Sequence, residues 1–147
     1  AKLGWESVQQ FPPKTWGMRE LIDAMVRTVQ SSKVGWVTAG EVRVQVPEEA
    51  LDHGLGGRAQ HLALASVQEL DPAKEWVVVT WASDGLDGRG GSGAILTSRD
   101  VRRMNRTAAE KALHTFRSGS YLKTLGCRLN SFASETNLTD LYMVLRL

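Results

Sequence analysis

Two acidic side chains stand in a stretch that has the composition of a ligand-binding loop. Asp84 and Asp87 lie in a run with glycines at 85, 88, 90, 91 and 93. Glycines let the backbone approach a ligand closely and expose N–H groups that can surround an anion. A carboxylate in such a loop can bind Mg²⁺ or orient a hydroxyl group. Asp-Gly steps are also typical of solvated turns, so both interpretations stay open from these residues alone.

An arginine beside a second glycine pair is the other group that could do chemistry. Gly56 and Gly57 precede Arg58, where a helix is predicted to begin. The free N–H groups and the dipole of a helix N-terminus attract anions, and a guanidinium can bind a phosphate or carboxylate through two hydrogen bonds. The pattern predicts an anion site at this helix end. The structural alternative is that Arg58 braces the neighbouring loops through Asp84 or Asp87.

The histidines do not predict a metal site. His61 lies one turn into the same helix, and no second histidine or cysteine stands at ligand spacing from it. A single histidine on a helix face is typically packed or solvated, and we expect the same of His53 and His114. Metal binding by this chain alone is therefore not expected.

These residues are positioned by alternating strands and helices. Predicted strands cover 34–38, 42–46, 76–81, 127–132 and 141–147. Predicted helices cover 15–30, 59–70, 98–105, 107–116 and 120–125, with Thr15 and Ser120 capping the first and the last. The pattern predicts an α/β fold, a three-layer α/β/α sandwich with a mixed sheet. Ligands of such folds bind beyond the carboxyl ends of the strands, where the glycine-rich loop would lie.

Four segments resemble, in order, motifs of one family. Residues 40–46 resemble a Gly-Gly-Glu strand entry, and residues 54–64 resemble Gly-x-Gly-Gly-Arg-Asn-Gln-Glu-Leu-Ala-Leu. Residues 80–94 resemble a segment with Gly-Thr-Asp-Gly-x-Asp-Gly, and residues 134–141 resemble Thr-Gly-Thr-Asn-Val-x-Asp-Leu. This family is the MOFRL domain, the carboxyl-terminal part of two-domain, ATP-dependent glycerate kinases that are also called hydroxypyruvate reductases.

The resemblance implies roles for the positions that match its motifs. Arg58 and Asp84 are the catalytic candidates if activity is retained. The candidates for substrate or phosphate binding are Gly56, Gly57, Gln60, Ser83, Gly85, Asp87, Thr136, Asn137 and Asp140. A kinase of this family would use ATP and Mg²⁺, and we expect no cofactor for this chain alone.

The chain also departs from the family pattern. Ala59 and His61 replace the Asn and Glu of the helix motif, and residues 89–94 lack an acidic residue of the family's glycine loop. The large amino-terminal kinase domain has no counterpart in the 147 residues. We therefore expect a domain that is not catalytic by itself and acts as a structural or accessory subunit of a larger complex. The alternative is the substrate- or phosphate-binding half of an ATP-dependent glycerate kinase that another chain completes.

Composition indicates one compact unit. The resemblance divides it into an N-terminal arm and helix (1–31) and a MOFRL-like domain (32–147). Hydrophobic residues make up 42% and charged residues 23%, with a net charge of +2, which is typical of globular proteins. No apolar run reaches the roughly 20 residues of a membrane helix. The single cysteine, Cys127, and the lack of a visible secretory signal predict an intracellular protein. Its compartment would be the cytoplasm or an organelle matrix such as that of the mitochondrion.

Two segments are candidate partner surfaces. Trp5 and Phe11 lie in the arm 1–13, whose prolines favour an extended chain; packing on this chain's own core is favoured over a protein partner. Four arginines are spaced i, i+3, i+4 and i+7, as on one helix face: Arg99, Arg102, Arg103 and Arg106. Such a stripe could contact RNA phosphates, although a solvated face is favoured.

Overall fold

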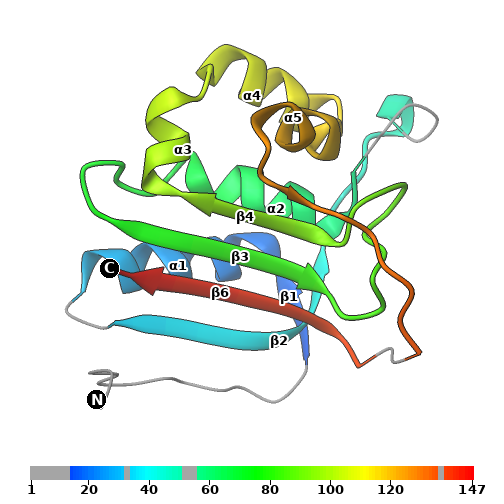
Figure 1. Cartoon of the computed structure of the whole chain (residues 1–147), viewed down its shortest axis with the longest axis horizontal. Helices are drawn as coiled ribbons and strands as arrows, with labels where there is room; N and C mark the ends of the chain where they lie inside the picture. Colours follow the sequence, from blue (N-terminus) through cyan, green and yellow to red (C-terminus); the bar gives the residue numbers. More distant parts are fainter. Residues whose placement is uncertain (1–13, 32–33, 51–55, 136–137) are drawn as a thin grey trace.

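A six-stranded mixed sheet forms the centre of the computed structural model, which describes residues 14–31, 34–50, 56–135 and 138–147 (Figure 1). The strands are β1 (Lys14–Gly17), β2 (Gly35–Arg43), β3 (Trp76–Ala82), β4 (Gly93–Thr97), β5 (Arg128–Leu129) and β6 (Asp140–Arg146). Their order in the sheet is β1-β2-β6-β3-β4-β5. β1 pairs with β2 in parallel, and the other neighbouring strands are antiparallel. The predicted α/β fold with a mixed sheet is confirmed.

The helices lie on one side of this sheet. They are α1 (Met18–Gln30), α2 (Arg58–Val67), α3 (Ser98–Arg103), α4 (Arg106–His114) and α5 (Ser118–Leu125), with a short 3-10 turn, η1, at Glu48–Ala50. α1 packs on β2 and β6, α2 packs on β3 and β4, and α4 and α5 pack on α2. Figure 1 looks onto the sheet with α1 and α2 behind it. The predicted third layer, helices on the opposite face, does not occur among the described residues.

Alternation along the strands explains which face the helices cover. In β3, Trp76, Val78, Thr80 and Ala82 are buried, and the residues between them are half-buried. Because successive side chains of a strand point to opposite faces, the buried set faces α1 and α2. α2 is buried along nearly its whole length, because the sheet lies on one side of it and α4 and α5 on the other.

Several predicted strand boundaries were wrong. Residues 34–46 do not form two strands, because β2 runs continuously through Gly40, which pairs with Asp140. Gly40 has a φ of 144°, a backbone conformation that residues other than glycine rarely adopt. Thr15 does not cap α1. It lies in β1 and pairs with Glu41 of β2, and Gly17 is the N-cap of α1. β4 was not predicted, and β5 has only two residues.

The last helices also differ from prediction at their boundaries. α3 and α4 are separate helices, as predicted, and α3 begins with a capping box between Thr97 and Asp100. α5 begins at Ser118 with Arg117 as N-cap, so Ser120 is not its cap. No helix of the described residues is long and apolar enough to span a membrane.

Candidate functional site

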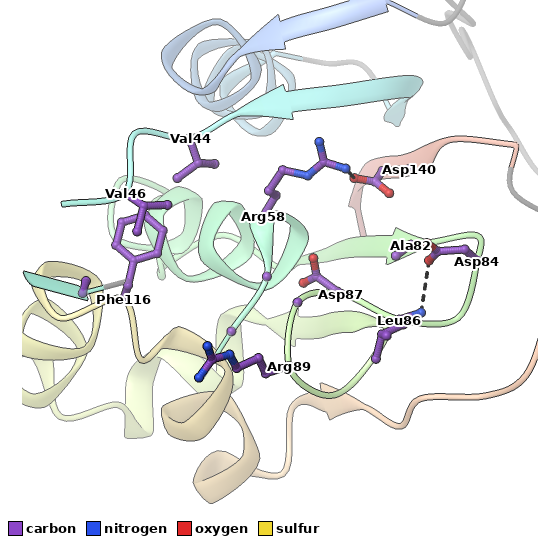
Figure 2. Close-up of a pocket in the computed structure, with 14 residues that line it drawn as sticks. Val44, Val46, Arg58, Ala82, Asp84, Leu86, Asp87, Arg89, Phe116 and Asp140 are labelled. Atoms are coloured by element: carbon purple, nitrogen blue, oxygen red, sulfur yellow. Dashed lines mark hydrogen bonds and ion pairs between the residues drawn. The ribbon is translucent and has the colours of Figure 1, made fainter. Parts of the chain in front are cut away.

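Six of the candidate residues meet in one pocket at the carboxyl ends of β2 and β3. Asp140 opens β6 and pairs with Gly40 of β2 and Ala82 of β3, so it lies between the ends of both strands. The N-terminus of α2 lies against this point, and the pocket has a volume of about 410 Å³ (Figure 2). Its walls are Val44, Val46, Ala50, Gly56, Gly57, Arg58, Ala82, Asp84, Leu86, Asp87, Gly88, Arg89, Phe116 and Asp140.

Arg58 is held by two carboxylates in this pocket. Its Nη1 donates to Oε2 of Glu41 at 3.0 Å, and its Nη2 lies 3.7 Å from Oδ2 of Asp140. Figure 2 shows its side chain extending toward Asp140. The side chain is 46% exposed. Arg58 therefore links β2 and β6 through Glu41 and Asp140, whereas the structural alternative predicted Asp84 or Asp87 as its partner. It still faces the pocket.

A buried chain of hydrogen bonds lies behind Arg58. The backbone N–H of Val42 donates to the hydroxyl of Tyr142 at 3.0 Å, and that hydroxyl donates to Oδ2 of Asp140 at 3.1 Å. Burial raises the pKa of Asp140, while the hydrogen bond from Tyr142 and the charge of Arg58 oppose that rise. Burial and the neighbouring Asp140 carboxylate raise the pKa of Tyr142. The hydroxyl of Tyr142 therefore stays protonated and donates the hydrogen bond that Asp140 accepts.

Asp87 occupies the N-terminus of α2 with its own carboxylate. Oδ1 accepts the N–H of Ala59 at 3.1 Å and Oδ2 accepts the N–H of Gln60 at 2.7 Å. The amide nitrogen of Gln60 returns two hydrogen bonds, to the carbonyl oxygens of Asp87 and Gly90 at 2.9 and 2.8 Å. Asp87 is 4% exposed. Burial raises the pKa of its carboxyl group, although the hydrogen bonds from Gln60 and Ala59 oppose this rise. Two donors of the predicted anion site are thus already engaged by a side chain of the glycine-rich loop.

The glycines near Asp87 permit this close approach. A Cβ on Gly57 would lie 1.9 Å from Oδ1 of Asp87. Gly88 has a φ of 67°, and a Cβ there would lie 2.6 Å from the carbonyl oxygen of Gly56. Gly56 itself packs against α5, where a Cβ would lie 2.8 Å from the nitrogen of Gly119. These glycines serve contacts between backbone segments of the protein itself.

The first half of the glycine-rich loop is a set of turns. Oδ1 of the exposed Asp84 accepts the N–H of Leu86 at 3.1 Å, which is the hydrogen bond of an Asx turn. The hydroxyl of Ser83 accepts the N–H groups of Leu138 and Thr139, both at 3.1 Å. Gly85, at a φ of 82°, receives a hydrogen bond from the N–H of Phe132. Ser83 and Gly85 therefore tie the loop to neighbouring segments.

His61 is packed, as expected. Its ring stacks on Phe116 with centroids 4.0 Å apart, and its Nδ1 lies 3.1 Å from the hydroxyl of Ser118. Burial lowers the pKa of His61 to about 4, so the ring is neutral at physiological pH. No group of three or more acidic, histidine or cysteine side chains within residues 14–31, 34–50, 56–135 and 138–147 is arranged to hold a metal ion.

The predicted arginine stripe is divided between two helices. Arg99, Arg102 and Arg103 lie in α3, and Arg106 begins α4. Because Met104 and Asn105 interrupt the helix, the four side chains do not share one helix face. Arg99 and Arg102 pair with Glu75, and Arg103 pairs with Asp100.

Other candidates could not be placed. Thr136, Asn137, Trp5 and Phe11 lie outside the described residues. Among the charged and aromatic residues that line the pocket, Arg89 and Phe116 were not predicted, and neither was Tyr142 behind Arg58. Tyr142 could have been found, because it follows Asp140 by two residues and so lies on the same face of a strand. Phe116 follows the end of α4 by two residues and has a φ of 54°, a conformation that its sequence does not suggest.

Comparisons with known proteins were made for the whole chain. The model of the MOFRL family matches residues 34–140. The crystal structure of glycerate kinase from Thermotoga maritima superposes with a TM-score of 0.80 over 98% of this chain and 37% of that chain, at 22% sequence identity. The PH0495 protein from Pyrococcus horikoshii gives a TM-score of 0.75 over 94% of this chain and 33% of that chain, at 19% identity. No curated protein matches the chain. The chain thus spans about a third of the length of either structure that it resembles.

Proposed function

Because the chain belongs to the MOFRL family, we propose that it is a glycerate-kinase-related domain that is not catalytic by itself and serves as a structural or accessory subunit of a larger assembly. The observation that carries this proposal is the carboxylate of Asp87 at the N-terminus of α2. It accepts the N–H groups of both Ala59 and Gln60. A helix N-terminus binds phosphate through such N–H groups, and here an internal anion takes them.

Most carboxylate oxygens of this pocket are already engaged, which disfavours the Mg²⁺ that a glycerate kinase would use with ATP. Both oxygens of Asp87 accept backbone N–H groups, and Oδ2 of Asp140 already accepts the hydroxyl of Tyr142 and faces Arg58. Asp84 is exposed and forms a turn. Mg²⁺ in phosphoryl-transfer sites needs one or two available carboxylates together with substrate phosphates.

The chemistry of phosphoryl transfer supports the same proposal. Phosphoryl transfer requires groups that position and neutralise the phosphates from several directions. A pocket built by one domain supplies only part of such a set.

The test is to isolate the native protein gently and determine its mass and companions. We expect an assembly well above 16.2 kDa, without a partner that resembles the rest of a glycerate kinase. The isolated chain should transfer no phosphate from ATP to glycerate, with the complete Thermotoga maritima enzyme as the positive control. A free monomer in the native extract, or turnover by the chain alone, would contradict the proposal.

A second candidate function rests on Arg58. Its side chain lines the pocket and is 46% exposed, so a small acid or a phosphate could displace Glu41 from the guanidinium group. The chain would then be the substrate- or phosphate-binding half of a kinase completed by another chain. Arg58→Ala should abolish binding of glycerate or inorganic phosphate in calorimetry without loss of fold, whereas Arg106→Ala, in the exposed first turn of α4, should not. Binding that survives Arg58→Ala would exclude this role.

A further inference from the structure

The face of the sheet opposite α1 and α2 is apolar, and none of the described helices covers it. We call it the open face, and Figure 1 views the molecule from this side. Its middle row crosses four neighbouring strands and consists of Val37, Met143, Val79 and Ile95. None of these side chains is buried, and Ile95 is 41% exposed. Phe132, which is 44% exposed, extends the face by stacking on Trp81 at 5.9 Å between ring centroids.

The open face is large enough for an interface between two proteins. Each strand residue covers about 16 Å² of a sheet, so the six strands together cover about 540 Å², and Phe132 adds to this area. A standard interface buries roughly 600–1,000 Å² on each partner, so the open face approaches the lower end of that range. Large contiguous apolar surfaces are rare on monomeric proteins and mark places where something binds. A flat surface does not enclose a small molecule as a pocket does, so the occupant that fits is another protein surface.

β6 divides the open face into a side of small residues and a side of large ones. On β2, Gly35 and Ala39 lie at the same levels as Val77 and Trp81 on β3, because each pair shares one partner residue on β6. A two-fold axis along β6 would place β2 of one copy over β3 of a second copy. Ala39 would then face Trp81, and Gly35 would face Val77. Packed sheets need such large-against-small contacts to interdigitate, so the open face is complementary to itself.

The same axis brings the residues of β6 against their own copies. Met143 lies at the centre of the middle row, between Val37 and Val79, and would meet the Met143 of the second copy. A methionine side chain is flexible enough to pack against its own copy. Strands related by an axis along β6 keep nearly the same direction, which is the aligned arrangement of two sheets that pack about 10 Å apart.

The distribution of charge also fits a second copy. The three rows of the open face that cross β2 from Gly35 to Ala39 contain no charged residue, so two copies can meet there without like charges in contact. Arg43 at the end of β2 and Asp84 just after β3 lie at the same end of the sheet, because both strands run antiparallel to β6. Both side chains are exposed. The two-fold axis would bring Arg43 of one copy toward Asp84 of the second copy, and such charge pairs at the rim of an interface fix its register.

We propose that the open face is a dimer interface, in which two copies of this chain pack their sheets face to face about a two-fold axis along β6. Most soluble oligomers have such closed symmetry, with the same surface used by both copies. An interface of this size fits association in the micromolar range. This inference goes beyond the proposed function, because it concerns the purified chain and needs no other protein.

Sedimentation equilibrium of the purified chain tests the dimer. The mass should rise with concentration from 16.2 kDa toward twice that value. Met143→Lys places two like charges against each other on the axis and should weaken association at least about tenfold, as for a contact at the centre of an interface. Thr107→Lys, with the same change of charge on the exposed surface of α4, should associate like the wild type. A chain that is monomeric at every concentration, or a dimer that Met143→Lys leaves intact, would overturn the proposal.

Cross-linking tests the two-fold arrangement without placing a charge in the sheet. Met143→Cys lies opposite its own copy on the axis, so a short bis-maleimide should join two chains through it, whereas Thr107→Cys should give no linked dimer. The wild type supplies the background, because Cys127 is buried and burial raises its pKa to about 11. Equal cross-linking of Met143→Cys and Thr107→Cys would overturn the proposal. Both measurements use the purified chain, so their outcome is independent of the companions in the native extract that test the proposed function.

Discussion

Gly57 lies so close to Asp87 that the α-carbon hydrogen of glycine fits between them and a methyl group does not. A Cβ at Gly57 would lie 1.9 Å from Oδ1 and 2.4 Å from the carbonyl carbon of Asp87. This contact joins the beginning of α2 to the glycine-rich loop, which are 30 residues apart. At this contact the carboxylate of Asp87 caps the N-terminus of α2.

Gly57→Ala should therefore destabilise the fold. We expect a loss of about 2–3 kcal/mol in the free energy of unfolding, as for overpacking of a rigid contact, measured by urea denaturation. Gly17→Ala is the matched control, because its Cβ would find only Cβ of Glu20, at 3.9 Å. It should cost less than about 1 kcal/mol. Equal losses for the two variants would contradict the close contact.

Asp87→Ala should convert the beginning of α2 into an anion site. Removing the carboxylate leaves the N–H groups of Ala59 and Gln60 without their acceptor, at a cost of about 2 kcal/mol. Inorganic phosphate should then raise the melting temperature of the variant more than chloride does at equal ionic strength. The wild-type protein and Asp84→Ala should respond equally to the two salts. A wild-type protein stabilised specifically by phosphate would count against the proposed function.

Tyr142→Phe should show the value of the buried hydroxyl behind Arg58. The variant leaves the N–H of Val42 and Oδ2 of Asp140 without the hydroxyl that bridges them, and we expect a loss of about 1–3 kcal/mol. Tyr121→Phe is the control, since that hydroxyl donates to the carbonyl oxygen of Asn105 at the surface. Its loss should stay below about 1 kcal/mol. Thermal or urea unfolding of both variants would decide.

His61 should make the fold sensitive to mild acid. Its pKa is about 4 in the folded protein against an ordinary value of 6.5, so between these values the unfolded chain binds a proton that the folded chain does not. Stability should therefore be retained above pH 6.5 and fall as the pH is lowered toward 4, by up to about 3 kcal/mol.

The control for this pH dependence is His61→Gln, which has no titrating group. The difference in unfolding free energy between wild type and His61→Gln should change over pH 4 to 6.5 and stay constant above it. A constant difference over the whole range would show that His61 is accessible to protons in the folded state.

The sequence predicted which residues lie close together better than it predicted what each of them contacts. Arg58, Asp87 and Asp140 were predicted as candidates, and they lie around one pocket because β6 begins between the carboxyl ends of β2 and β3. The pairing of Arg58 with Glu41 and the capping of α2 by Asp87 were not predicted. Both depend on which strands are neighbours in the sheet, and a linear pattern does not encode that order.

The fold class was predictable from local sequence patterns, whereas several strands and their boundaries were not. Long apolar runs such as 76–82 indicate a buried strand on their own. β4 was missed because its five residues follow a run of glycines, and it is a strand only through its pairing with β3. The continuous β2 was missed because Gly40 reads locally as a turn, while its pairing with Asp140 keeps it in the strand.

The position of β6 has a consequence for how this domain is made on the ribosome. Among the strands that the structure describes, β2 and β3 do not pair with each other, and β6 alone joins β1 and β2 to β3, β4 and β5. Residues 140–146 are synthesised after every other strand, so a nascent chain that stops short of them holds two separate sheet fragments with unpaired edges. The central pairings are also the most distant in sequence, which slows folding. The domain therefore folds as a unit only after Arg146 has left the exit tunnel, and until then the exposed edges of β2 and β3 are where a chaperone would be needed.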